Sequence, residues 1–178
     1  YSICRFGNKR IISNRPKIID QKKHIGHWEG DRIEFEKIKG PAITTLVERK
    51  SRFLLLIKNT SRYSAHVMQE IINKFKTAPQ KACRSITFDQ GVEFARPELL
   101  ERAVKCRVYY CHTHSPWEKG ANENMNGRLR WFLPRSTNIL NITQEELDLL
   151  AWRMNNTPRK CLDFRTPKEL FLKYYQGF

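Results

Sequence analysis

The sequence has 178 residues, of which 40% are hydrophobic, and its 33 Lys and Arg against 18 Asp and Glu give a formal net charge of +15. This length and apolar content allow one domain with a hydrophobic core and exclude a disordered chain. No apolar run approaches the ~20 residues of a transmembrane helix, which excludes a membrane-spanning protein. The positive charge favours a polyanion partner such as DNA or RNA, because Lys and Arg release counterions when they neutralise phosphates.

Residues 1–26 carry seven Lys and Arg against a single acid, Asp20. This composition predicts a basic, mostly irregular N-terminal arm, with the folded domain and its C-terminal helices over residues 27–178. The chain has no initiator Met and no signal peptide, so we expect a piece of a longer cytosolic protein. Its five cysteines include no C-x-x-C pair, which argues against a disulfide framework and favours a reducing compartment.

Three apolar, β-rich segments follow the arm, at residues 27–35, 42–48 and 52–58. We expect them to be strands, and the short junctions between them favour antiparallel hairpins. A helix is predicted over 63–77, where apolar residues recur at helical spacing and form one face.

In the rest of the chain, strands alternate with helices. We expect strands at 85–89 and 106–111, and helices at 96–104, 119–132, 143–156 (with Thr143 as N-cap) and 166–175. Three antiparallel strands followed by this alternation predict an α/β fold with a mixed five-stranded sheet flanked by helices. This is the element order of an RNase H-like fold.

Three acids lie at element ends where a site could form. Asp31 lies in the first predicted strand, Asp89 closes the fourth, and Glu123 lies on the helix after the fifth. In a mixed sheet the first and fourth strands can be neighbours, which would bring Asp31 and Asp89 together. At about 100° per residue, Glu123 falls opposite an apolar stripe that includes Met125 and Leu129, so it should face an open, basic surface.

Clustered carboxylates repel one another unless a divalent cation neutralises them, and hard oxygen ligands select Mg²⁺ or Mn²⁺. Two such ions, ~3.5–4 Å apart, can activate a water or hydroxyl and stabilise the leaving oxygen at phosphorus. The alternative is that a chain with 18 acids places some at strand ends by chance. Spacing alone leaves both interpretations open.

Five stretches carry a resemblance that covers nearly the whole chain. They are "GHWEGD" (26–31), "TLVERKSRF" (45–53), "ITFDQGVEF" (86–94), "SPWEKGANENMNGRLRWFLPR" (115–135) and "NNTPRKCLDFRTPKELF" (155–171). Together and in this order they resemble the catalytic core of insertion-sequence transposases of the IS-thirty family. These are DDE enzymes related to retroviral integrases. Gln90, where the family usually has Asn, and Arg32, where an apolar residue is common, depart from the pattern without removing an acid.

The resemblance implies that Asp31, Asp89 and Glu123 are the catalytic residues and hold two Mg²⁺ ions, for which Mn²⁺ would substitute. It implies strand cleavage at transposon ends and strand transfer into target DNA in the bacterial cytoplasm, with a homo-oligomer as the expected form of the full-length protein. Members normally also carry an N-terminal helix-turn-helix region, which this sequence lacks. Two rivals stay open: a non-catalytic DNA-binding or assembly module from a decayed transposase, and a structure-specific nuclease on the same fold.

The remaining candidates concern contacts around these acids. Glu29 shares a strand face with Asp31 and is expected to support the metal ligands rather than to be one. Phosphate contacts are expected from residues near the Glu123 helix, namely His114, Lys119, Asn126, Arg128 and Arg130. The cluster of Cys106, Cys111, His112 and His114 matches no common zinc spacing. Trp28 and Trp117 flank the proposed site, and core packing is the favoured prediction for both over stacking on bases.

Overall fold

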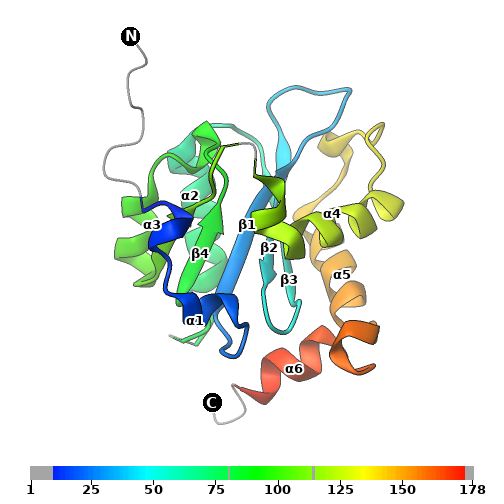
Figure 1. Cartoon of the computed structure of the whole chain (residues 1–178). Coiled ribbons are helices and arrows are strands. Elements are labelled where there is room, and N and C mark those ends of the chain that lie inside the picture. The colour runs from blue at the N-terminus through cyan, green and yellow to red at the C-terminus, as the bar shows by residue number, and fades with distance from the viewer. Residues whose placement is uncertain (1–9, 80, 114, 175–178) are drawn as a thin grey trace.

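The computed structural model describes residues 10–79, 81–113 and 115–174. A five-stranded mixed sheet is its centre, in the order β3-β2-β1-β4-β5 (Figure 1). β1 pairs antiparallel with β2, and β2 with β3, whereas β1–β4 and β4–β5 are parallel. The strand bounds are β1 His27–Ile33, β2 Ala42–Glu48, β3 Leu54–Asn59, β4 Ser85–Phe88 and β5 Arg107–Tyr110. The predicted α/β fold is confirmed, including the adjacency of the first and fourth strands.

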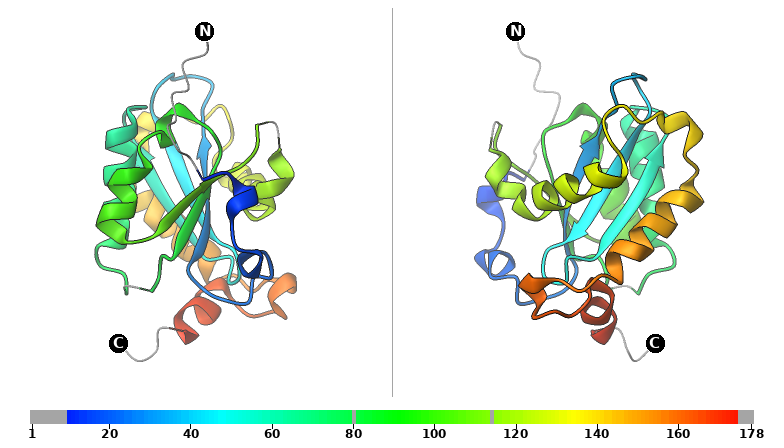
Figure 2. Two further views of the ribbon diagram at one scale, coloured as in Figure 1. Left: turned by 60° about the vertical axis from the view of Figure 1, so that its left-hand side comes forward. Right: turned by 90° about the vertical axis from the view of Figure 1, so that its right-hand side faces the viewer.

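Helices cover both faces of this sheet. α2 and α3 pack on one face, and α4 and α5 on the other (Figure 2). The helix bounds are α1 Lys17–Asp20, α2 Ser64–Phe75, α3 Pro97–Val104, α4 Gly120–Phe132, α5 Gln144–Asn155 and α6 Pro167–Lys173, with short 3-10 turns η1 Ile12–Asn14, η2 Val92–Phe94, η3 Pro116–Lys119, η4 Ile139–Asn141 and η5 Lys160–Leu162. None of the described helices is long and apolar enough to cross a membrane.

Local sequence explains where the last helices begin. Thr143 accepts a hydrogen bond from the backbone N–H of Glu146, whose side chain accepts one from the backbone of Thr143 in return. Thr166 and Glu169 form the same capping box at the start of α6. Each box satisfies two backbone N–H groups that a helix start leaves without partners, so both helices begin at the predicted threonines.

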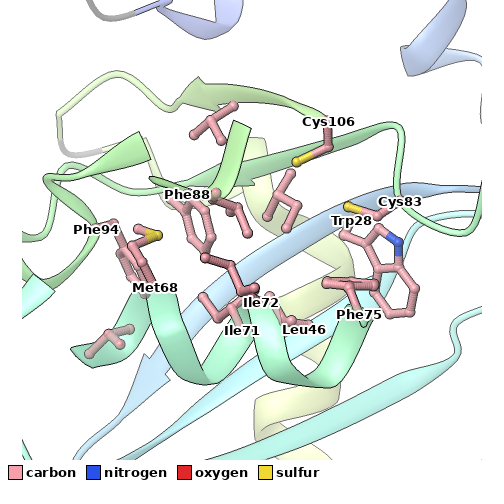
Figure 3. Packing of buried hydrophobic residues seen from close by; sticks show 14 of the residues in the cluster. Trp28, Leu46, Met68, Ile71, Ile72, Phe75, Cys83, Phe88, Phe94 and Cys106 are labelled. Carbon is pink, nitrogen blue, oxygen red and sulfur yellow. The ribbon is translucent and has the colours of Figure 1, made fainter. Parts of the chain in front are cut away.

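Two hydrophobic cores hold the helices to the sheet. In the core beneath α2 and α3, Trp28 of β1 lies edge-on to Phe75, and Phe88 stacks on Phe94 with ring centroids 4.2 Å apart (Figure 3). The indole N–H of Trp28 donates to the backbone oxygen of Ala82 at 2.7 Å. Trp28 is therefore a core residue, as predicted, and is not exposed to a nucleic acid base.

The described part of the predicted arm, residues 10–26, packs against the sheet. Ile19 and Ile25 are buried, and the buried Arg15 donates to the Thr87 hydroxyl of β4 at 2.9 Å. This segment is therefore folded onto the domain and is not an irregular extension. Burial of its few apolar side chains stabilises the packing of this segment on the sheet. The basic composition of the segment gives no sign of that burial. The remainder of the arm lies outside the described residues.

Both edges of the sheet have hydrogen-bond partners. At the β3 edge, Asn155 of α5 accepts from the backbone N–H of Leu54 and donates to its oxygen, both at 2.8 Å. Gln144, at the other end of α5, accepts from the N–H of Lys58 at 2.8 Å and donates to the oxygen of Leu56 at 2.9 Å. At the β5 edge, the segment before α1 forms a parallel bridge and accepts a backbone hydrogen bond.

Gly30 of β1 lies directly beneath the ring of Phe88. A Cβ atom added to Gly30 would lie 2.2 and 2.5 Å from two ring carbons of Phe88 and 3.2 Å from a methyl of Leu46. Both neighbours are fully buried and cannot move aside. We therefore expect Gly30→Ala to lower the free energy of unfolding by about 1–3 kcal/mol, the usual effect of overpacking, as measured by urea denaturation.

Gly127→Ala is the matched control, because an added Cβ there meets nothing within 4 Å and Gly127 lies inside α4. Alanine favours a helix by about 1 kcal/mol over glycine, so this control should be neutral or stabilising. Equal stability of the two variants would contradict the packing of Phe88 on β1.

Candidate active site

The register of the sheet places Asp31 and Asp89 at equivalent positions along neighbouring strands. Glu29 of β1 pairs with Thr87 of the parallel β4, and each acid lies two residues further along its strand direction. Asp89 follows directly after the end of β4, where its carboxylate accepts a hydrogen bond from the backbone N–H of Gly91 at 2.9 Å. The two acids therefore lie at neighbouring positions at one end of the sheet.

The side chain of Lys119 lies between these two carboxylates. Its Nζ atom is 2.8 Å from Asp31 Oδ1 and 3.1 Å from Asp89 Oδ2, and it donates to the backbone oxygen of Gly30 at 3.3 Å. Only 8% of Lys119 is exposed. The sequence predicts a DNA contact for this residue, but in the structure its ammonium donates to the two acids. A positive charge between adjacent carboxylates reduces their mutual repulsion.

Burial and charge act together on this cluster. Burial raises the pKa of the Asp31 carboxyl above its ordinary value, the Lys119 ammonium opposes this, and the negative charge of Asp89 raises it further. Burial lowers the pKa of the Lys119 amine, but the charges of Asp31 and Asp89 outweigh it, so this pKa is raised and the amine is protonated. Lys119 thus favours the charged form of Asp31, while burial opposes it.

Glu123 of α4 lines the same cavity as Asp31 and Asp89. It lies in the first turn of α4 and is exposed. A cavity of about 520 Å³ is lined by Asp31, Asp89 and Glu123 together with Lys119 and Asn126. Within the described part of the chain, no three His, Cys, Asp or Glu side chains lie close enough to hold one ion. Glu123 therefore shares this acid-lined cavity with the other two acids but does not complete a three-ligand cluster.

The donor set of this cavity suits a hard divalent cation. Carboxylate oxygens are the ligands that Mg²⁺ and Mn²⁺ prefer. Oxygens of Asp31 and Asp89 already converge on one positive charge, the Lys119 ammonium. The residues present therefore fit a metal ion at this end of the sheet.

Glu29 anchors the helix that carries Glu123. Its buried carboxylate accepts from the backbone N–H groups of Ala121 at 2.9 Å and Asn122 at 3.0 Å, and from Arg49 Nε at 2.9 Å. A negative charge is favourable there, because the N–H groups of the first helical turn have no partners inside the helix. Glu29 contacts α4 and Arg49, which is consistent with the expectation that it supports the site.

The predicted DNA contacts lie in different surroundings. Asn126 donates to Asp31 Oδ2 at 2.8 Å, so it is a partner of the acids. Arg130 donates to a backbone oxygen of the loop after β1 at 2.8 Å. Arg128 is exposed and lines a separate cavity. His114 lies outside the described residues. Trp117 is 73% exposed, so the predicted core packing of this residue is wrong.

The spacing of Lys119 and Asn126 from Glu123 predicts that these three residues lie close together, which composition alone does not predict. Lys119 and Asn126 lie four before and three after Glu123, and such spacing places side chains on one stripe of a helix. Applied to the predicted helix 119–132, the rule places an ammonium, a carboxylate and an amide on one face. In the structure Lys119 lies in η3 and Asn126 in α4, and both contact Asp31. The spacing does not predict that Lys119 is buried, because its burial depends on how α4 packs on β1.

The Cys and His cluster does not form a metal site in the described residues. Cys106 and Cys111 are buried, and burial raises the pKa of the Cys111 thiol to about 12. The His112 ring lies 2.8 Å from a carboxylate oxygen of Glu118. Among the described side chains, no three His, Cys, Asp or Glu are grouped so that they could hold a metal ion.

The fold is that of retroviral integrase catalytic cores. The catalytic core domain of BIV integrase matches with a TM-score of 0.64 and 18% identity, over 86% of this chain and 97% of that one. The simian T-cell lymphotropic virus intasome structure matches with a TM-score of 0.62 and 19% identity, over 83% of this chain and 57% of that one. At this identity the likeness concerns the fold alone.

No family model matches the sequence, but several curated relatives are similar to it. Transposase InsI for insertion sequence element IS30A from Escherichia coli is 41% identical over 163 residues, which cover 92% of this chain and 42% of the relative. The transposase for insertion sequence element IS1086 from Cupriavidus metallidurans is 38% identical over 89% of this chain and 47% of the relative. The chain thus spans less than half of the length of these relatives. Over the region that it covers, the chain is a homologue of these insertion-sequence transposases.

Proposed function

We propose that this chain is the DDE catalytic domain that cleaves DNA strands and joins them to target DNA during transposition of an insertion sequence. The observation that carries the proposal is the cavity that Asp31, Asp89 and Glu123 line together. The integrase-like fold and the homology to transposases support it. The positions of these three acids relative to the predicted strands and helices also support it.

In the proposed mechanism, Asp31, Asp89 and Glu123 would hold two Mg²⁺ ions, or Mn²⁺ in their place. When bound, such ions act as Lewis acids at phosphate oxygens and favour deprotonation of an attacking water or 3′-hydroxyl. Asn126 fixes the orientation of the Asp31 carboxylate through its hydrogen bond. Gly91 does the same for Asp89 through its backbone N–H. The exposed Glu123 faces the open side, from which a phosphodiester would approach.

The proposed substrates are the transposon ends and the target DNA, and the proposed compartment is the bacterial cytoplasm. A net charge of +15 supports a DNA partner, because each neutralised phosphate releases counterions. We further propose that the full-length protein is a homo-oligomer. One copy offers one acid-lined cavity among its described residues, whereas transposition joins two ends.

The test is a strand-transfer assay with the chain of 178 residues. A labelled oligonucleotide with a free 3′-hydroxyl is incubated with supercoiled plasmid and Mg²⁺. We expect covalent joining of the label to plasmid that EDTA abolishes. Binding of DNA without any cleavage or joining in Mg²⁺ or Mn²⁺ would favour the non-catalytic module instead. Cleavage at branched structures without joining would favour the nuclease.

Lys119 supplies a prediction about metal binding. Its ammonium occupies the position between Asp31 and Asp89 where a cation would bind. The uncharged Lys119→Gln should therefore bind Mn²⁺ several-fold more tightly than the wild-type chain, because no ammonium has to be displaced. Isothermal titration calorimetry measures this directly. Lys173→Gln, which removes a charge at the end of α6, should leave the affinity unchanged. Weaker Mn²⁺ binding by Lys119→Gln would show that the ammonium and the metal do not compete.

A further inference from the structure

A second cavity, with a strongly basic lining, borders α4. Its volume is about 620 Å³. The lining contains basic side chains from the turn after α1, the turn between β2 and β3, α4 and η5, and it contains no Asp or Glu. These basic residues are Lys22, Arg52, Arg128, Arg159 and Lys160. We call this the basic cavity.

The basic cavity and the acid-lined cavity lie on opposite sides of α4. Glu123 and Asn126 line the acid-lined cavity, whereas Asn124 and Arg128 line the basic one. At about 100° per residue, these two pairs project from nearly opposite faces of a helix. The helix that carries a candidate catalytic acid therefore separates the two cavities.

The positive charges of the basic cavity have no carboxylate partners. Among the described residues, none of the five basic side chains forms an ion pair. Burial lowers the pKa of Lys22, and the charge of Arg52 lowers it further. Burial likewise lowers the pKa of Arg159, with Arg128 adding to the effect. At Lys22 the charges of Glu29 and Asp20 oppose this shift but are outweighed. Like charges are thus brought together without an ion-pair partner, which an anion would supply.

Arg159 gives an independent indication of a ligand. Only 7% of this residue is exposed, and its Nη2 atom donates to the backbone oxygen of Met154 at 3.2 Å. Its Nε atom is buried and has no hydrogen-bond partner in the described part of the chain. A buried donor without an acceptor costs roughly 1–3 kcal/mol. An anion with several oxygens would satisfy such a donor.

We propose that the basic cavity binds phosphates of a DNA backbone, as a sequence-independent contact separate from the acid-lined cavity. This inference rests on the proposed function and adds a place where the substrate is held. An α-helix with its side chains is about 10–12 Å wide, and one DNA strand advances about 3.4 Å per nucleotide. A strand that crosses α4 would thus present phosphates roughly three or four nucleotides apart to the two cavities.

The experiment measures DNA affinity by fluorescence anisotropy, with a labelled duplex and the whole chain, at several salt concentrations. Arg128→Gln combined with Lys160→Gln removes two exposed charges from the cavity. We expect affinity to fall about tenfold or more at low salt, and the slope of log K against log salt to become shallower by roughly 0.9 per lost phosphate contact. Arg102→Gln combined with Arg107→Gln is the matched control, with the same charge loss at exposed positions of α3 and β5.

The control should change affinity less than twofold, and thermal unfolding should show that both double variants are folded. Equal losses in the two variants would overturn the basic cavity as a site, while the strand-transfer assay would still test the proposed function. Failure of the wild-type chain to bind duplex would overturn both. If inorganic phosphate bound the cavity and the cavity variant kept wild-type DNA affinity, the ligand would be a small anion and the proposal would be wrong.

Discussion

Asp31→Asn, Asp89→Asn and Glu123→Gln will each reduce strand cleavage and strand transfer by about three orders of magnitude or more, while duplex DNA affinity changes little. Each substitution keeps the shape of the side chain but removes a charged oxygen ligand. Residues that act as one catalytic unit show losses of this size singly, and combining them adds little. The measurement is the rate of oligonucleotide joining to plasmid in Mg²⁺, with affinity determined separately by anisotropy.

Glu98→Gln is the control for these three variants. Glu98 is an exposed acid of α3 whose ion pair with Arg96 is also exposed, so its loss should not affect the rate. Asp31 also needs a check on folding, because its carboxylate is paired with the Lys119 ammonium. A folded Asp31, Asp89 or Glu123 variant with near-normal turnover would remove that residue from the catalytic set.

Glu29→Ala should lower the free energy of unfolding by about 3–5 kcal/mol, the effect of breaking a buried ion pair on one side. The change leaves the buried guanidinium of Arg49 with only the more distant carboxylate of Asp20, at 3.5 Å, and it removes the acceptor for the N–H groups of Ala121 and Asn122. Urea denaturation gives the loss of stability. Hydrogen exchange should show faster exchange at the amides of residues 121 and 122 than in the wild-type chain.

Glu29→Gln separates the two roles of this residue. The amide oxygen can still accept a hydrogen bond at the start of α4, but the charge that pairs with Arg49 is lost, so the destabilisation should be smaller. Glu36→Ala, at an exposed position of the loop after β1, should have little effect on either measurement. If Glu29→Ala left amide exchange in α4 unchanged, Glu29 would not be the residue that anchors the start of this helix.

The fold could be predicted from the sequence because its elements have strong local signals. Short β-rich runs with short connections between them predict β1 to β3, and the apolar face of residues 63–77 predicts α2 almost to its ends. The alternation that follows restricts the topology, since parallel strands need crossover connections. The neighbouring positions of Asp31 and Asp89 follow from that topology.

Contacts between distant segments could not be predicted in this way. The basic composition of residues 10–26 suggests an irregular arm, yet Ile19 and Ile25 bury enough apolar surface to fix the segment on the sheet. Lys119 resembles a solvated base in a basic stretch, and only the docking of α4 on β1 places its ammonium between two acids. Burial of a charge depends on its tertiary partners, which local sequence patterns do not encode.

The covered edges of the sheet restrict how copies of this domain can assemble. An open edge strand is a template on which another chain can add a strand. Here the amides of Gln144 and Asn155 take the place of a neighbouring strand at β3, and the chain before α1 does so at β5. Growth of the sheet across a subunit boundary would first have to break these hydrogen bonds. In the proposed assembly around DNA, copies would therefore contact one another through helix faces and loops, which would leave β1 and the end of β4, where Asp31 and Asp89 lie, undisturbed.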